Sequence, residues 1–136
     1  MSYLLDTNIL SELVRPKPNH NVLKWVDSVP HEALHISVLT LGEIRKGVET
    51  IRSGERKEEL ILWLDYELPK WFTNRVLAVD HSIADRWGKL QAQIKRPIPA
   101  IDSLLAASAL QHNLKLVTRN VKDFHFPQLE VINPWE

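Results

Sequence analysis

Short apolar segments of strand length alternate with longer segments of helical periodicity along the whole sequence, and this alternation most constrains the fold. The strand-like segments are residues 3–5, 34–38, 76–79 and 114–117, with a weaker one near 131–132. Crossovers this long between strands require a mostly parallel sheet with helices on both faces. We therefore predict an α/β fold with three layers (α/β/α), right-handed crossovers and about four or five strands.

The intervening segments predict helices whose apolar residues recur at spacings of three and four. One begins after Asp6-Thr7-Asn8, the next is capped by Asn19, and strongly helical stretches cover residues 55–68 and 101–110. Pro69 is expected to end the helix over 55–68, because proline lacks a backbone N–H. At 136 residues the chain is expected to form a single domain over 1–136.

Composition excludes several kinds of site. The chain has no cysteine, which rules out disulfides, thiolate zinc sites and a cysteine nucleophile. Its formal net charge is zero, so any nucleic-acid contact must come from a local patch. No run approaches the roughly 18 apolar residues of a membrane helix, and the N-terminus lacks the pattern of a secretory signal. We expect a cytoplasmic protein with no membrane partner.

Acidic residues follow the predicted strands. Asp6 comes directly after the first strand, Glu43 lies in the first turns of the helix after the second, and Asp102 opens the helix before the fourth. Ligands bind beyond the carboxyl ends of parallel strands, so these carboxylates are expected to converge there. Clustered carboxylates raise one another's pKa, and a divalent cation such as Mg²⁺ or Mn²⁺ removes that cost.

Each acid also has a purely structural interpretation. Asp6 is a favoured N-cap type, and Glu43 lies three residues after Thr40, which is the spacing of a capping box. Asp102 complements a helix dipole, and Asp123 suits a turn. Only the joint placement of the acids at one sheet edge favours the functional interpretation.

The ordered motifs resemble those of PIN-domain ribonucleases across the whole chain. The matching segments are Leu4-Leu5-Asp6-Thr7-Asn8, then residues 40–47 (TLGEIRKG), residues 100–109 (AIDSLLAASA), and Leu116-Val117-Thr118-Arg119-Asn120 with Asp123-Phe124. The resemblance is nearest to VapC-type toxins of type II toxin–antitoxin pairs. The closing Asn133-Pro134-Trp135-Glu136 is similar to the FitB-like branch.

The resemblance implies an endoribonuclease that depends on Mg²⁺ or Mn²⁺, with Asp6, Glu43 and Asp102 as the catalytic acids that bind the metal. A metal-activated water would attack the scissile phosphate, leaving a 5′-phosphate and a 3′-hydroxyl. Many relatives have an aspartate where this chain has Asn120. Asn120 and Asp123 are the candidates for a fourth position in this site. The number of metal ions, one or two, and the target RNA stay open.

Polar and basic residues flank these acids. Side chains expected to hold the loops and orient the carboxylates are Thr7, Asn8 and Thr118. Candidates for binding the substrate phosphate are Arg45, Lys46, Arg119 and Lys122, with solvated surface charge as the alternative. The six histidines show no metal-ligand spacing and no pair suited to acid–base catalysis.

The resemblance also implies partners: an RNA substrate, a cognate VapB-like antitoxin bound in a groove among the helices, and a second copy in a homodimer. Operator DNA would be contacted only indirectly, through the antitoxin, which agrees with the neutral charge. Two alternative functions stay open. One is a toxin-like binding scaffold in a repressor complex, and the other is a housekeeping PIN nuclease.

Overall fold

The computed structural model describes residues 1–136 and contains one five-stranded sheet. Its strands are β1 (Tyr3–Leu5), β2 (Leu34–Ser37), β3 (Val76–Leu77), β4 (Lys115–Val117) and β5 (Val131–Ile132). Their order across the sheet is β3-β2-β1-β4-β5, and every neighbouring pair is parallel. The predicted α/β class and the parallel sheet of four or five strands are confirmed.

The order in which strands are added to the sheet reverses at its centre, although all strands stay parallel. It builds from β1 outward to β2 and β3, and then crosses back so that β4 pairs with the other side of β1. The register of that pair aligns Leu5 with Val117, the last residue of each strand. Such a switch point leaves a crevice beyond the carboxyl ends of the two strands, which makes the residues after Leu5 and Val117 the ones best placed to bind a ligand.

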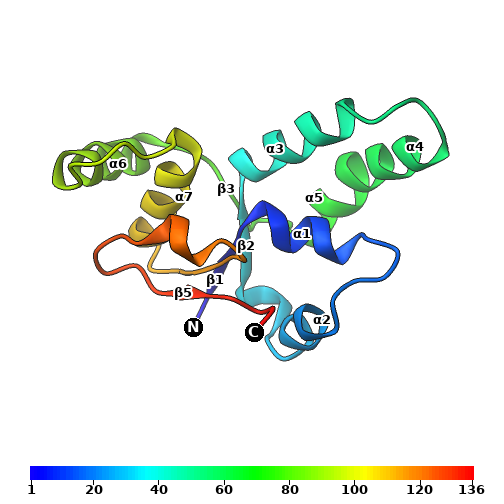
Figure 1. Cartoon of the computed structure of the whole chain (residues 1–136), viewed down its shortest axis with the longest axis horizontal. Helices are drawn as coiled ribbons and strands as arrows, with labels where there is room; N and C mark the ends of the chain where they lie inside the picture. The colour runs from blue at the N-terminus through cyan, green and yellow to red at the C-terminus, as the bar shows by residue number, and fades with distance from the viewer.

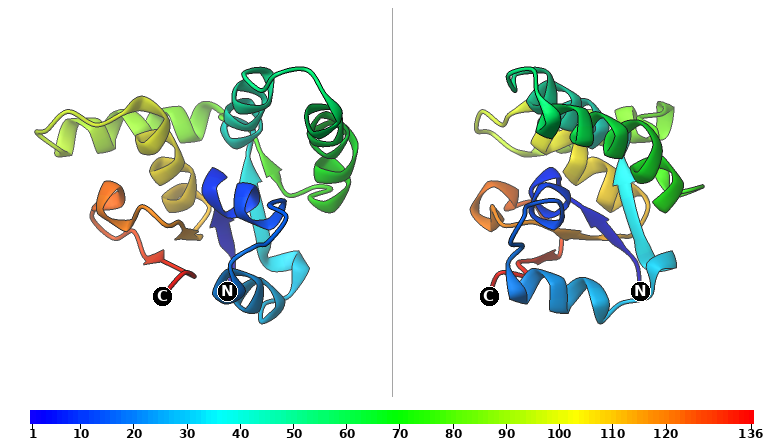
Figure 2. Two further views of the ribbon diagram at one scale, coloured as in Figure 1. Left: turned by 45° about the vertical axis from the view of Figure 1, so that its right-hand side comes forward. Right: turned by 90° about the vertical axis from the view of Figure 1, so that its right-hand side faces the viewer.

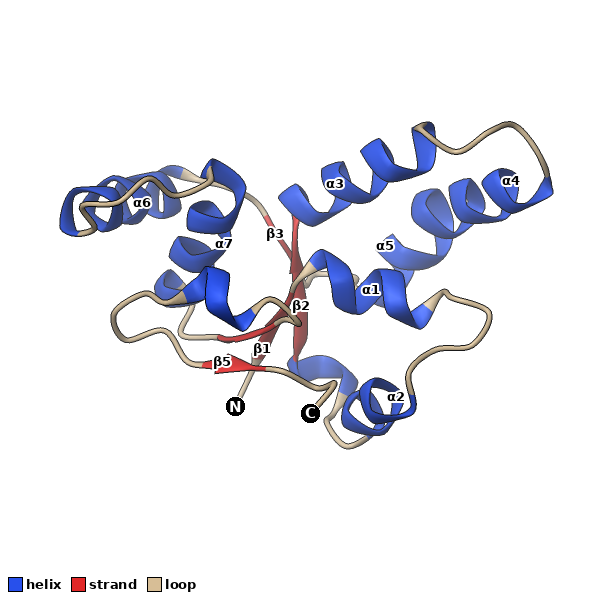
Figure 3. Ribbon diagram, viewed as in Figure 1, coloured by secondary structure: helices blue, strands red, loops and turns tan.

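Helices connect the strands and cover the sheet (Figure 1; Figure 3). The α-helices are α1 (Thr7–Leu13), α2 (His20–Asp27), α3 (Val38–Glu49), α4 (Glu55–Leu62), α5 (Leu68–Trp71), α6 (His81–Gln93) and α7 (Ala100–Gln111). Three shorter helical segments are η1 (His31–Ala33), η2 (Trp63–Glu67) and η3 (Val121–Phe124). None of these helices combines the length and the apolar character that a bilayer crossing requires.

Alternation along the strands gives the sheet an apolar core on each face. Leu5 and Val117 belong to a cluster with residues of α1 to α5, whereas their neighbours Leu4 and Leu116 belong to a second cluster with α6 and α7. The two groups of helices lie on opposite sides of the strands (Figure 2). The expected three-layer arrangement follows from this two-sided burial.

The prediction that Pro69 ends a helix is wrong. The helical path of α4 continues through η2, a π-helical turn, into α5, which carries Pro69 in its first turn. In that wider turn the Leu68 N–H donates to the Trp63 carbonyl, five residues back. A π turn changes the backbone register just where proline would meet a carbonyl of the preceding turn, so the chain stays helical.

Candidate active site

Asp6 lies at the switch point between β1 and β4. It is the N-cap of α1 in an extended conformation, and its Oδ1 accepts a hydrogen bond from the Thr7 backbone N–H at 2.8 Å. Its own N–H donates to the Val117 carbonyl at 2.9 Å, which extends the pairing of β1 with β4. The side chain is only 7% exposed, so the carboxylate forms the floor of the site. The N-cap interpretation of Asp6 is therefore correct, and it is compatible with the functional one.

A hydrogen-bond network ties this floor to the loop after β4. The Thr118 hydroxyl donates to Asp6 Oδ2 at 2.8 Å and accepts from the Asn8 amide at 3.3 Å and from the Asn120 N–H at 3.1 Å. Asn8 Nδ2 also lies 3.4 Å from Asp6 Oδ2, and Asn8 Oδ1 accepts from the Arg119 N–H at 3.3 Å. The two loops at the switch point therefore hold each other, and they fix the orientation of the carboxylate.

Glu43 and Asp102 reach the same crevice from two helices. Together with Asp6 they line a cavity of about 420 Å³. Asp102 lies in the first turn of α7, and Glu43 lies in the second turn of α3, where its Oε1 accepts from the Thr7 hydroxyl at 2.7 Å. The fold thus brings together three acids that are far apart in the sequence.

The capping-box interpretation of Glu43 is wrong. Ser37, the last residue of β2, is the N-cap of α3, and its hydroxyl accepts from the Leu39 N–H at 3.1 Å. Thr40 is buried inside the helix and its hydroxyl has no partner. Since β2 ends earlier than its apolar alternation predicts, the helix begins earlier, and Glu43 is left free to face the cavity.

The carboxylates at this edge repel one another. Burial is the largest cause that raises the pKa of Asp6, the hydrogen bonds from Thr118 and Thr7 oppose it, and the charges of Glu43 and Asp123 add to it. Burial, followed by the charges of Asp6, Asp123 and Glu43, raises the pKa of Asp102 to about 6. None of these acids forms an ion pair with Lys, Arg or His. The three carboxylates that line the cavity therefore have no paired cation, although Arg15 and Arg119 also lie on its lining.

These residues fit a hydrated divalent cation. Carboxylate oxygens and the Asn120 carbonyl are hard ligands of the kind that Mg²⁺ and Mn²⁺ prefer. No three His, Asp or Glu side chains are close enough to enclose an ion directly. Mg²⁺ usually keeps several of its waters and binds through one or two carboxylates, so the open spacing suits such an ion.

The remaining predicted residues divide between the cavity wall and its surroundings. Asn120 and Arg119 line the cavity, as do Thr7 and Asn8, whereas Asp123 is exposed on η3 and acts on the site only through its charge. Three of the predicted phosphate-binding residues do not reach the wall: Arg45, Lys46 and Lys122. Of these, Arg45 pairs with Asp65 and Glu49 on the other side of α3.

Sequence reasoning missed a polar stripe that runs along α1 and one turn beyond its end, and one residue near the C-terminus. The added cavity residues are Ser11, Glu12, Arg15 and Trp135. The first three lie at helical spacings from Thr7 and Asn8, so the periodicity that identified the apolar face of α1 would also have found its polar face. Nothing local in the sequence predicts that Trp135 reaches the cavity.

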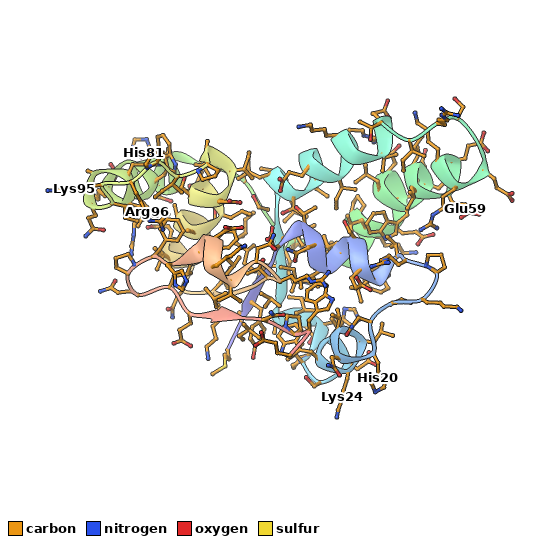
Figure 4. All side chains as sticks on the ribbon, viewed as in Figure 1. His20, Lys24, Glu59, His81, Lys95 and Arg96 are labelled. Atoms are coloured by element: carbon orange, nitrogen blue, oxygen red, sulfur yellow. The ribbon has the colours of Figure 1, made fainter.

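The histidines do not form an alternative catalytic pair. Figure 4 shows His20 on α2 and His81 on α6 at opposite sides of the molecule. Neither these nor the other four histidines line the acidic cavity. Acid–base catalysis by paired histidines therefore has no support at this site.

Comparison with known proteins identifies close relatives over nearly the whole chain. The model of the PIN domain matches residues 3–128. The toxin FitB of Neisseria gonorrhoeae is 36% identical over 135 residues, which cover 97% of each chain. The VapC ribonuclease Y4jK of Sinorhizobium fredii is 34% identical over 136 residues, which cover 98% of this chain and 97% of that protein.

Solved structures agree with these sequence relationships. The FitAcB structure from Neisseria gonorrhoeae superimposes with a TM-score of 0.91 at 35% identity and covers 98% of this chain and 99% of that one. A structure of FitAB bound to an IR36 DNA fragment gives a TM-score of 0.89 at 33% identity, with coverage of 98% and 96%. The likeness therefore extends to the complete arrangement of strands and helices.

Proposed function

Since the chain belongs to the PIN-domain family, we propose that it is a metal-dependent endoribonuclease and the toxin of a toxin–antitoxin pair. Relatives named as a toxin and as a VapC ribonuclease support a nuclease. The observation that carries the proposal is that three carboxylates, Asp6, Glu43 and Asp102, line one cavity and form no ion pair.

In this proposal Asp6, Glu43 and Asp102 are the residues that would hold a hydrated Mg²⁺ or Mn²⁺ in the cavity. When bound, the ion offsets the charge of the phosphate and lowers the pKa of a coordinated water. Thr118 and Asn8 keep Asp6 in one orientation, and Thr7 does the same for Glu43. Asn120 presents an amide to the cavity that orients water or phosphate.

Cleavage of a mixed-sequence single-stranded RNA by the purified protein tests the proposal. We expect cleavage with Mg²⁺ or Mn²⁺ and none with a chelator, and a fall of about 100-fold or more in Asp6→Asn and Asp102→Asn. Asp85→Asn is the matched control, because it removes the same charge from the exposed outer part of α6. Unchanged cleavage by either cavity variant, at an unchanged melting temperature, would contradict the assignment.

Thermal unfolding gives a second test that does not depend on activity. A cation that binds only the folded protein raises its stability by about 2.7 kcal/mol at 100 times the dissociation constant. We expect Mn²⁺ or Mg²⁺ to raise the melting temperature of the wild type and of Asp85→Asn, and to have little effect on Asp6→Asn. A titration that shows no shift at millimolar metal would argue against a divalent-ion site.

We also propose that an antitoxin binds this chain and supplies the DNA contacts of the complex. The solved FitAB–DNA structure supports this, as does the zero net charge of this chain, which gives it no broad basic surface for a duplex. We expect the chain to co-purify with the small protein encoded beside it and to shift operator DNA only in that complex.

Two alternative functions have their own tests. Cleavage that disappears in Asp6→Asn would rule out a role as a scaffold alone. The absence of a neighbouring gene for a small antitoxin would favour a housekeeping nuclease. The predicted homodimer stays a prediction, to be measured by light scattering.

A further inference from the structure

Two residues from distant parts of the chain meet at the acidic cavity. Arg119 lies in the loop after β4, and Trp135 follows β5 near the C-terminus. The guanidinium carbon of Arg119 lies 5.1 Å from the centroid of the Trp135 ring, and both side chains line the cavity that contains Asp6. This separation is within the range of a cation–π contact.

The backbone on both sides of this pair is held in place. The Arg119 N–H donates to Asn8 Oδ1 at 3.3 Å, so the arginine is tied to the same network as Asp6. The Trp135 N–H donates to Asn133 Oδ1 at 3.0 Å, and its carbonyl accepts from the Asn21 amide at 3.0 Å. The indole also packs against the apolar cluster that includes Leu5 and Val117. Trp135 is therefore a fixed platform for the exposed side chain of Arg119.

Arg119 differs from the other arginine of the cavity in its free hydrogen-bond donors. Arg15 pairs with the buried carboxylate of Glu12 at 3.1 Å. The guanidinium of Arg119 makes no ion pair and no hydrogen bond with the protein, and stacking on a ring leaves the N–H groups at its edge available. It is thus a cation on the cavity wall whose charge is not already balanced by a protein carboxylate.

We propose that Arg119, stacked on Trp135, binds a phosphate of the RNA strand beside the scissile bond, which deepens the function proposed above and rests on it. A polyanion that approaches clustered carboxylates is repelled, and a planar guanidinium at the rim offsets that repulsion through two parallel hydrogen bonds. The ring limits the conformations of the arginine, so less entropy is lost when the phosphate binds. Arg119 contacts the substrate, and Trp135 is a positioning residue.

Binding of a short fluorescent RNA, measured in the Asp6→Asn background to prevent cleavage, tests this proposal together with KM and kcat in the wild-type background. We expect Arg119→Gln to weaken binding and raise KM about tenfold with a smaller change in kcat. The slope of log affinity against log salt should fall by about 0.7, the value for one phosphate contact on a single strand. Trp135→Leu should raise KM about threefold, and Trp135→Phe, which keeps an aromatic face, should stay near wild type.

Arg96→Gln is the matched control, because Arg96 stacks on Phe126 at 5.9 Å but projects from the outer side of the molecule (Figure 4). It should leave KM and the salt slope unchanged. An unchanged KM and slope in Arg119→Gln would overturn the proposal, as would a loss of antitoxin binding alone. If the wild type binds RNA and Arg119→Gln lowers the salt slope as expected, but the wild type does not cleave RNA, only the proposed function would be overturned. Failure of the wild type to bind RNA would overturn both.

Discussion

The floor and the wall of the acidic cavity hold their carboxylates in opposite ways. On the floor, between β1 and β4, Asp6 is buried and accepts hydrogen bonds from the Thr7 N–H and from Thr118. On the wall, Asp102 lies in the first turn of α7, and its carboxylate oxygens accept no hydrogen bond. Burial and neighbouring charges raise its pKa to about 6. One carboxylate is part of the architecture, and the other is left unsatisfied.

The difference suggests separate roles: Asp6 contributes to the stability of the fold, whereas Asp102 is available to a ligand. Hydrogen bonds to a buried carboxylate compensate part of its loss of water, so the network around Asp6 holds the junction of two loops together even though burial raises the pKa of Asp6. A carboxylate with raised pKa and no partner instead makes the folded state less stable when it is ionised. Protonation or a bound cation relieves that cost, so we expect the same substitution to have unequal effects at Asp6 and at Asp102.

Replacing each acid by alanine should give the largest contrast. Asp6→Ala removes an N-cap and leaves Thr118 without its acceptor, so we expect a loss of about 2 kcal/mol in the free energy of unfolding. Asp102→Ala removes only repulsion and should change stability by less than about 0.5 kcal/mol, or raise it. Urea unfolding at pH 8 with a chelator measures both. Equal losses for the two variants would show that Asp6 and Asp102 contribute alike to the stability of the fold.

Removing the hydroxyl of Thr118, which donates to Asp6, should lower the free energy of unfolding less than removing the Asp6 carboxylate. Thr118→Val keeps the shape of a fully buried side chain but takes away the hydroxyl that donates to Asp6. We expect a loss of about 1.5 kcal/mol, because the carboxylate stays buried with one donor fewer. The double variant Thr118→Val with Asp6→Asn should lose less than the sum of its parts. Strict additivity in this cycle would show that the two side chains are not coupled.

The stability of the metal-free protein should depend on pH through Asp102, and in the same direction through Asp6, whose pKa burial also raises. The pKa of Asp102 is raised from 3.8 in the unfolded chain to about 6 in the folded one, so between these values the folded state holds a proton that the unfolded state has released. Stability should thus fall as pH rises from 4 to 6, by about 1 kcal/mol after allowing for the partial exposure of the group. Asp102→Asn should flatten this part of the curve. The prediction would be contradicted if the free energy of unfolding rose between pH 4 and 6 in the wild type and rose less in Asp102→Asn.

The smallest effect is expected at the rim of the cavity. Thr7→Val removes the hydrogen bond from the Thr7 hydroxyl to Glu43, which is exposed, and should cost less than about 0.5 kcal/mol. The Asp6 floor should be unaffected, because the Thr7 backbone N–H remains its donor. Chemical denaturation checks the stability. A loss of unfolding free energy as large as that of Thr118→Val would show that the hydrogen bond from Thr7 to Glu43 also stabilises the fold.

Local patterns in the sequence were sufficient for much of this fold. Short apolar runs, which alternate with polar residues over 34–38, predict the strands, and Asn19 caps α2 as expected, accepting from the N–H groups of Asn21 and Val22. The position of Asp6 directly after a buried strand was enough to place it at the sheet edge. Such features depend on neighbours within a few residues, where spacing alone fixes which side chains share a face.

The sequence by itself determined a parallel α/β chain with acids at the carboxyl ends of its strands. Only the tertiary structure decided that β4 lies beside β1, that α4 passes through a π turn toward Pro69, and that Arg119 rather than Arg45 faces the acids. Trp135 reaches Arg119 because β5 pairs with β4, a contact that no local pattern encodes. Strand order and side-chain neighbours across the sheet depend on how complete layers pack, and the free energy of that packing is shared among residues far apart in the chain.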